Sequence, residues 1–183
     1  MLDNPALGLP IPPEHLENRL LGQRFRMALM QPDDEPSIVQ VITQTLLRFH
    51  DEGEIVASTQ RCLPRFYQSY RENGALYLVL KDALSATVIG GVGVRAFAGL
   101  DPAESLGEIR ELVIDPNFRG LGLGRSLLSV ATQKARALGY RRLYLAATSE
   151  MRHAQSLFQR SGFRPLAAPQ GRESFPSYFV KDE

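Results

Sequence analysis

The chain has 183 residues, 44% of them hydrophobic and 22% charged, which is typical of one globular domain with a sizeable core. Lysines and arginines total 21 against 20 aspartates and glutamates, so the formal net charge of +1 gives no general attraction to nucleic acid or to an anionic membrane. The single cysteine, Cys62, excludes an internal disulfide framework and any multi-cysteine metal site.

The sequence shows no recognisable targeting or membrane segment. No apolar run approaches the roughly 20 residues that cross a bilayer, and residues 1–13 lack the charged start and apolar stretch of a signal peptide. His15 and His50 have no partners at metal-ligand spacing, so we expect no metal site. We therefore expect a cytoplasmic protein that contacts neither a membrane nor nucleic acid.

The first half of the chain predicts an arm, then helices and strands. Residues 1–23 are proline-rich with one short helical pattern, and we assign them to an N-terminal arm before a single domain at 24–183. Hydrophobic periodicity and turn residues then predict the elements in order. These are a strand over 25–30, a helix capped by Asp33 or Asp34, a helix over 63–71, and paired strands over 75–81 and 88–97.

The second half alternates strands and helices. We expect strands over 108–114, 142–147 and 175–180, a helix over 122–138 ended by Gly139, and a helix over 150–160 capped by Thr148 or Ser149. Strands in the middle of the chain, followed by alternating helices and strands, indicate an α/β domain built on a mixed sheet.

The most informative segment is residues 108–125, which reads EIRELVIDPNFRGLGLGR. Three glycines at alternating positions, Gly120, Gly122 and Gly124, let the backbone turn tightly and approach a ligand closely. The helix that starts there points its free N–H groups and its positive dipole end at the same place, which favours an anion. Arg119 and Arg125 bracket the turn and add donors suited to phosphate oxygens.

Two other phosphate-binding motifs do not fit. A Walker loop requires a Gly-Lys pair, and the chain contains none. The run Gly91-Val92-Gly93 imitates a dinucleotide fingerprint, but a strand continues on both sides of it and no helix follows. We interpret these glycines as part of a strand that permits a bulge or a close backbone approach.

The segment from Arg119 to Gly124 resembles the Arg/Gln-x-x-Gly-x-Gly/Ala signature of the GNAT superfamily of acyl-CoA-dependent N-acyltransferases. Downstream, Ala154 and the run LFQRSGF at 157–163 are similar to the second helix of that family and its closing Gly-Phe. The match covers about residues 108–166, whereas the first 70 residues match only in kind. The resemblance implies a GNAT domain with a mixed, mostly antiparallel sheet flanked by helices.

The resemblance also implies that the chain binds acetyl-CoA as co-substrate. The backbone of residues 120–125 would hold the pyrophosphate, and the backbones of Leu112, Val113 and Ile114 would bond the pantetheine arm and the thioester carbonyl. The implied cofactor-binding set is Leu112, Val113, Ile114, Arg119, Gly120, Leu121, Gly122, Leu123, Gly124, Arg125 and Phe158.

Two carboxylates, Glu108 and Glu111, precede the glycine turn and are the candidate catalytic bases. Three residues apart on a strand, they face opposite sides unless a bulge intervenes, so we expect one of them to reach the cleft. Each could instead form a salt bridge on the strand face, with Arg110 or Arg95 as partner.

The chain departs from the family in its second helix. Many relatives place a tyrosine, as acid toward the coenzyme A thiolate, where this chain has Phe158, and an asparagine where it has Met151. Tyr144 and Tyr178 are alternative acids, although each could be a core or sheet-face aromatic residue. His153 is a weaker candidate for a base.

The resulting hypothesis is an N-acetyltransferase that acts on the primary amine of a small or amino-acid-like acceptor by direct attack in a ternary complex. A protein or peptide N-acetyltransferase and a noncatalytic acyl-CoA-binding regulatory module are the alternatives. A homodimer is possible, because relatives often form one.

Overall fold

The structure is a computed structural model that describes residues 24–47, 65–71, 74–97, 105–166 and 177–182. Seven strands form one sheet in the order β1-β2-β3-β4-β5-β7-β6. The strands are β1 (Phe25–Leu29), β2 (Leu76–Asp82), β3 (Val88–Ala96), β4 (Leu106–Ile114), β5 (Arg142–Ala147), β6 (Arg164–Pro165) and β7 (Ser177–Asp182). The helices are η1 (Pro32–Asp34), α2 (Glu35–Leu46), α4 (Phe66–Ser69), η3 (Pro116–Phe118), α5 (Leu123–Ala137) and α6 (Arg152–Arg160).

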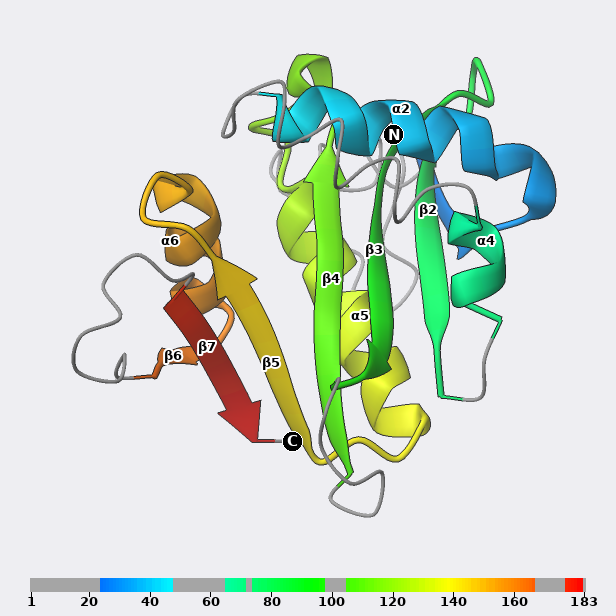
Figure 1. Ribbon diagram of the computed structural model, residues 1–183. Coiled ribbons are helices and arrows are strands. Elements are labelled where there is room, and N and C mark those ends of the chain that lie inside the picture. The colour runs from blue at the N-terminus through cyan, green and yellow to red at the C-terminus, as the bar shows by residue number, and fades with distance from the viewer. Residues whose placement is uncertain (1–23, 48–64, 72–73, 98–104, 167–176, 183) are drawn as a thin grey trace, which may run out of the picture.

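The sheet is mixed and mostly antiparallel, as the sequence predicts. Only β4 and β5 run parallel, and every other neighbouring pair of strands is antiparallel. The right-handed connection that a parallel pair requires is supplied by α5, which crosses behind the sheet in Figure 1.

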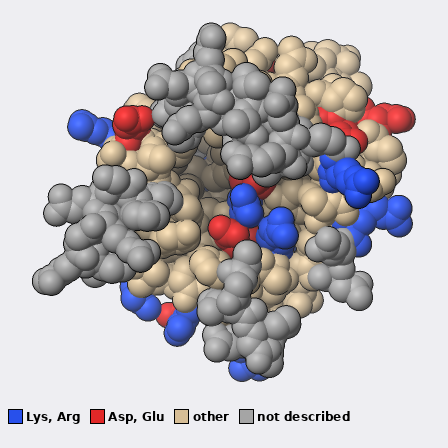
Figure 2. All heavy atoms as spheres, in the orientation of Figure 1, with Lys and Arg blue, Asp and Glu red and all other residues tan. Residues whose placement is uncertain are grey.

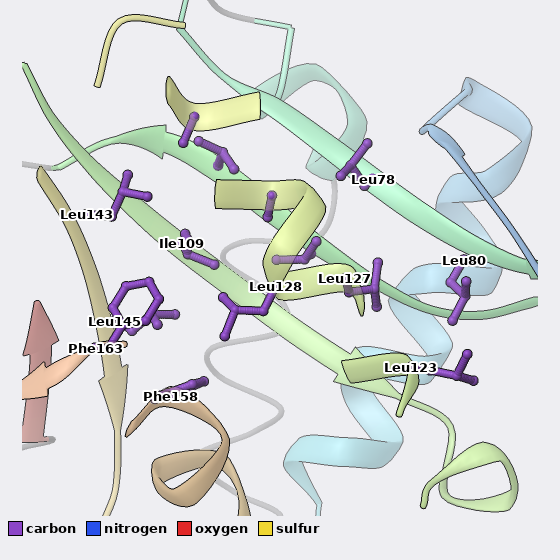
Figure 3. Packing of buried hydrophobic residues seen from close by; sticks show 14 of the residues in the cluster. Leu78, Leu80, Ile109, Leu123, Leu127, Leu128, Leu143, Leu145, Phe158 and Phe163 are labelled. Carbon is purple, nitrogen blue, oxygen red and sulfur yellow. The ribbon is translucent and has the colours of Figure 1, made fainter. Parts of the chain in front are cut away.

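Helices cover both faces of the sheet and divide the core in two. Helix α5 packs its apolar stripe, including Leu127, Leu128 and Ala131, on one face, and Figure 3 shows these leucines directed at the strands. Helices α2 and α4 cover β2 to β4 on the opposite face, where Ile38 and Phe66 are buried. In Figure 1 this second face is turned toward the viewer, and we call it the front face.

Strands β4 and β5 are joined only over a short seam. Their register pairs Leu106 with Arg142, Gly107 with Leu143, and Glu108 with Tyr144. Beyond Glu108 the two strands diverge, and Figure 1 shows them meeting at the lower end and spreading apart toward α2. Among the described residues, the edge of β4 from Leu112 to Ile114 therefore has no strand partner on the side of β5.

The predicted strands and the longer helices are confirmed with small boundary shifts. The helix predicted over 63–71 is described only as the four residues of α4, and the short helices η1 and η3 were not predicted. Helix α6 begins after Met151 with no side-chain cap, so the predicted cap at Thr148 or Ser149 is wrong. The carbonyl oxygen of Thr148 accepts from Met151 N and Gln155 Nε2. The two-residue strand β6 was not predicted, since two residues carry no alternating pattern. The predicted arm, Cys62, His15 and His50 lie outside the described residues. Residues 63–64 of the predicted helix over 63–71 and residues 175–176 of the predicted last strand lie outside them as well.

Within the described residues, no helix has both the length and the apolar character needed to cross a membrane.

Candidate active site

A β-bulge in β4 shapes the candidate site. The register with β3 shifts between Gly91 and Gly93, so that Val92 lies opposite two residues of β4, Glu111 and Leu112. Glu111 adopts a positive φ of 43°, a conformation that non-glycine residues rarely take. The extra residue reverses the alternation of side chains along β4, so two glutamates that lie three residues apart can face the same side of the sheet.

Because of the bulge, Glu108 and Glu111 both reach the front face. Arg110 lies between them, with its Nε 3.1 Å from Glu111 Oε1 and its NH1 3.8 Å from Glu108 Oε2. The expectation that only one carboxylate reaches the cleft is therefore wrong, while the salt-bridge partner Arg110 is confirmed. Figure 2 shows basic and acidic side chains together near the middle of this face, beside a hollow.

Two buried tyrosines hold Glu111 in place. Tyr70 donates its hydroxyl to Glu111 Oε2, and Tyr77 donates its hydroxyl to the backbone oxygen of Glu111 at 2.9 Å. With Phe66 the two rings form an edge-to-face triangle whose centroids lie 5.0 to 5.2 Å apart. Burial and the neighbouring Glu111 raise the pKa of Tyr70, so its hydroxyl stays protonated and keeps donating.

The glycines of β3 make room for these tyrosines. A Cβ on Gly93 would lie 2.3 Å from the Tyr70 hydroxyl oxygen, and a Cβ on Gly91 would lie 2.4 Å from Cε1 of Tyr77. The interpretation of this run as a strand with a close approach and a bulge is confirmed. Sequence reasoning did not identify Tyr70 or Tyr77, because their contacts with β4 depend on tertiary packing alone.

Glu108 differs from Glu111 in its surroundings. Both carboxylate oxygens of Glu111 have close partners, whereas the only ion pair of Glu108 among the described residues is the longer contact to Arg110. Burial raises the pKa of Glu108 above the ordinary value of 4.5, although the nearby Arg110 and Arg95 oppose that rise. A half-buried carboxylate with a raised pKa is suited to accepting a proton near neutral pH.

The glycine turn is an open cradle. Gly120 and Gly122 have φ values of 81° and 74°, and a Cβ on either would have no atom within 4 Å. Gly122 is the N-cap of α5, so the first N–H groups of the helix face the same open space. Arg119 donates from Nε to the backbone oxygen of Ile114 at 3.1 Å, which ties the turn to the end of β4.

A basic groove continues from the cradle along α5. It has a volume of about 380 Å³ and runs between α5, the end of α6 and β7. Its lining includes four cationic side chains and no carboxylate: Arg125, Arg136, Arg160 and Lys181. Arg125 belongs both to the cradle and to the groove. Apart from Arg125 these residues were not identified from the sequence, because they come from three elements that only the fold brings together.

The remaining candidates lie in different environments. Phe158 is 4% exposed and packs on Phe163 and Phe179 in the core behind the sheet (Figure 3). Tyr144 and Tyr178 lie on the front face, where Phe97 contacts both rings at centroid distances of 4.7 and 6.1 Å. His153 is exposed on α6.

One further polar side chain lies at the end of β5, beyond the point where β4 and β5 diverge. Thr148, directly after β5, has a buried hydroxyl without a hydrogen-bond partner among the described residues. The described ranges contain no group of three or more His, Cys, Asp or Glu residues arranged to hold a metal ion.

Comparison with known proteins agrees with this geometry. The sequence pattern of the acetyltransferase (GNAT) family matches residues 43–163, which include the bulged strand, the glycine turn and α6. The chain belongs to the GNAT family. It is therefore an acetyl-CoA-dependent N-acetyltransferase.

Three relatives illustrate the range of the match. The uncharacterized N-acetyltransferase YjgM of Escherichia coli K12 is 30% identical over 152 residues, 81% of this chain and 87% of YjgM. An aminoalkylphosphonate N-acetyltransferase of Salmonella typhimurium is 31% identical over 104 residues, 54% of this chain and 68% of that protein. The structure of a phosphinothricin acetyltransferase from Sinorhizobium meliloti, in complex with acetyl-CoA, superimposes with a TM-score of 0.67 at 20% identity, covering 87% of this chain and 88% of that one.

The residues present fit acetyl-CoA. The cradle offers helix N–H groups in a space that any side chain at Gly120 or Gly122 would fill, as a pyrophosphate requires. The unpaired edge of β4 offers backbone groups to an extended amide chain such as pantetheine. Acetyl-CoA supplies the thioester that the acceptor amine attacks.

Proposed function

We propose that this GNAT enzyme acetylates the primary amine of a small, amino-acid-like acceptor by direct attack in a ternary complex. One observation carries the proposal: Glu108 faces the front at the last position where β4 pairs with β5, beside the point where the two strands diverge to admit the thioester. A base on one side and a cofactor cleft on the other are what a direct transfer requires.

The cofactor-binding set assigned from the sequence provides the cofactor half of the site. The backbone N–H groups of residues 120–125 hold the pyrophosphate, and the free edge of Leu112 to Ile114 pairs with pantetheine and donates to the thioester oxygen. The basic groove would receive the 3′-phosphate of the same coenzyme A, since Arg125 belongs to both regions.

Glu108 is the general base in this proposal. It accepts a proton from the attacking amine, directly or through one water molecule, as the new carbon–nitrogen bond forms and the carbon–sulfur bond breaks. Glu111 has a positioning role, because its carboxylate is already bound by Tyr70 and Arg110. The departing thiolate is stable enough to leave without a protein acid, which is compatible with a phenylalanine in the core at position 158.

The nature of the acceptor is supported by the enclosure of the front face and by the relatives. Helices α2 and α4 stand over β2 to β4, and the rings of Phe97 and Tyr144 lie beside Glu108, so a small molecule fits better than a folded protein. The aminoalkylphosphonate enzyme, judged by its name, also acts on a small amine.

The test is thiol release from acetyl-CoA by the purified chain, measured across small amines, amino acids and lysine-bearing peptides, after calorimetry has established acetyl-CoA binding. Turnover with a small amine supports the proposal. Turnover confined to peptides would favour the protein acetyltransferase alternative. Tight binding of acetyl-CoA with no turnover on any acceptor would indicate a noncatalytic acyl-CoA-binding module and would overturn the proposal.

A further inference from the structure

Arg95 is a cation of the front face that forms no ion pair with any of the described residues. It lies on β3 directly opposite Glu108 of β4, and cross-strand partners point to the same face of a sheet. Their neighbours Val94 and Ile109, also opposite each other, point to the other face and are buried against α5. The register therefore fixes Arg95 beside Glu108 on the front face.

The pairing of charges on this face leaves Arg95 available. Arg110 forms ion pairs with both Glu108 and Glu111, whereas Arg95 makes no ion pair or hydrogen bond with any described residue. Its charge nevertheless acts on this cluster, because it lowers the pKa of Glu108 and of Tyr70 against the effect of burial. The guanidinium thus lies near the carboxylate that would take the proton, and it is half-buried rather than fully solvated.

The geometry points to Arg95 as the residue that binds an acidic group of the acceptor, so that the substrate is an amine carrying a carboxylate or phosphonate. This inference rests on the proposed function. The Cβ atoms of directly opposed strand residues are about 5 Å apart, so one small molecule can present its amine to Glu108 and its acid to Arg95. The planar guanidinium offers paired donors that match both kinds of acidic group.

The cross-strand placement of Arg95 beside Glu108 also favours compact acceptors. A compact aminoalkyl acid, with its amine and its acid on the same or neighbouring carbon atoms, can reach both residues at once. A long diamine or an internal peptide lysine has no acid at that distance. The inference therefore narrows the acceptor from small amines in general to short amino acids and aminoalkylphosphonates.

The experiment compares matched acceptors with and without the acid. Alanine is paired with ethylamine, phenylalanine with phenethylamine, and 1-aminoethylphosphonate with ethylamine. We expect wild-type turnover on at least one acid-bearing member, and we expect Arg95→Gln to lower its kcat/KM about 10- to 100-fold, the effect of losing a hydrogen bond between charged groups. This loss should appear mainly as a higher KM for the acceptor, with the KM of acetyl-CoA unchanged. Arg95→Lys should recover part of the lost kcat/KM.

Arg26→Gln, on the edge strand β1, is the matched control and should leave all values unchanged. A merely electrostatic influence of Arg95 on Glu108 would lower turnover of both members of a pair equally and shift both pH profiles, which would overturn the inference. Turnover by the wild-type enzyme of plain amines alone would also overturn it while leaving the proposed function intact.

The absence of any turnover would contradict the proposed function first. In that case calorimetry of the same acids with the coenzyme A complex decides the role of Arg95. Binding that is lost in Arg95→Gln supports it, and no binding to the wild-type protein excludes it.

Discussion

At the scale of single residues, the structure gives different surroundings to two glutamates that the sequence does not distinguish. Glu111 is bound through both oxygens, and Glu108 is left with a raised pKa and a longer contact. The sequence predicts both as candidates, because both carboxylates precede the glycine turn along the chain. It does not rank them, because the ranking depends on Tyr70, which lies 41 positions earlier in the chain than Glu111.

The pH profile tests Glu108 as the base. Its raised pKa means that it still carries a proton at pH values where an exposed glutamate is charged, so activity should fall on the acid side at a pH above 4.5. Glu108→Gln should lower kcat about 100-fold or more and remove this acid limb, as measured by thiol release from pH 5 to 9. An unchanged profile in that variant would exclude Glu108, and Glu150→Gln, after β5, serves as the control.

Tyr70→Phe tests the support of Glu111. The ring keeps its packing on Phe66 and Tyr77 while the hydroxyl donor is lost, which leaves a half-buried carboxylate oxygen without its partner. We expect the free energy of unfolding to fall by about 1.5 to 3 kcal/mol, measured by urea denaturation. Tyr67→Phe, on the same short helix, should change it little, and equal stability of the two variants would contradict the role of Tyr70.

At the scale of elements, regular pieces are predictable and their distortions are not. The bounds of β5 agree with those expected, and α5 differs by one residue at each end, because alternation and helical spacing are local signals. The bulge in β4 is different. A positive φ at a glutamate is intrinsically unfavourable, so it is imposed by the tyrosines and glycines around it, which no local pattern reveals.

The glycine turn permits a matched pair of substitutions. Gly122 and Gly139 border opposite ends of α5, both have positive φ, and neither would bring a Cβ within 4 Å of another atom. Gly122→Val and Gly139→Val should therefore lose similar stability from the backbone. Only Gly122→Val should abolish acetyl-CoA binding in calorimetry, because its side chain enters the cradle. Retained affinity in a folded Gly122→Val protein would disprove the pyrophosphate assignment.

At the scale of the whole molecule, the order of elements and the mixed sheet follow from the sequence, but the divergence of β4 and β5 does not. Pairing from Leu106 to Glu108 and no further is a property of two strands that lie 28 residues or more apart in the chain. The acceptor side of the site cannot be predicted from the sequence either, because the position of Arg95 beside Glu108 depends on the register of β3 against β4.

Acetyl-CoA should stabilise the whole fold by filling the gap between these strands. At a free concentration of 100 times Kd the expected gain is about 2.7 kcal/mol in the free energy of unfolding, with a rise in Tm. Amide hydrogen exchange should slow at Leu112 to Ile114, the edge that pairs with pantetheine. Gly122→Val should show neither effect, and protection confined to α5 would contradict the placement of pantetheine along β4.

The divergence of the two strands also gives this protein a sheet edge inside the molecule. Free strand edges attract other extended chains, and proteins normally shorten, charge or cover them. Here the side chains of Leu112, Val113 and Ile114 are buried or half-buried, but the backbone of this stretch has no partner on the side of β5 among the described residues. Protein stored without coenzyme A should therefore self-associate through the unpaired edge of β4. Short extended peptides should compete with acetyl-CoA for the same edge.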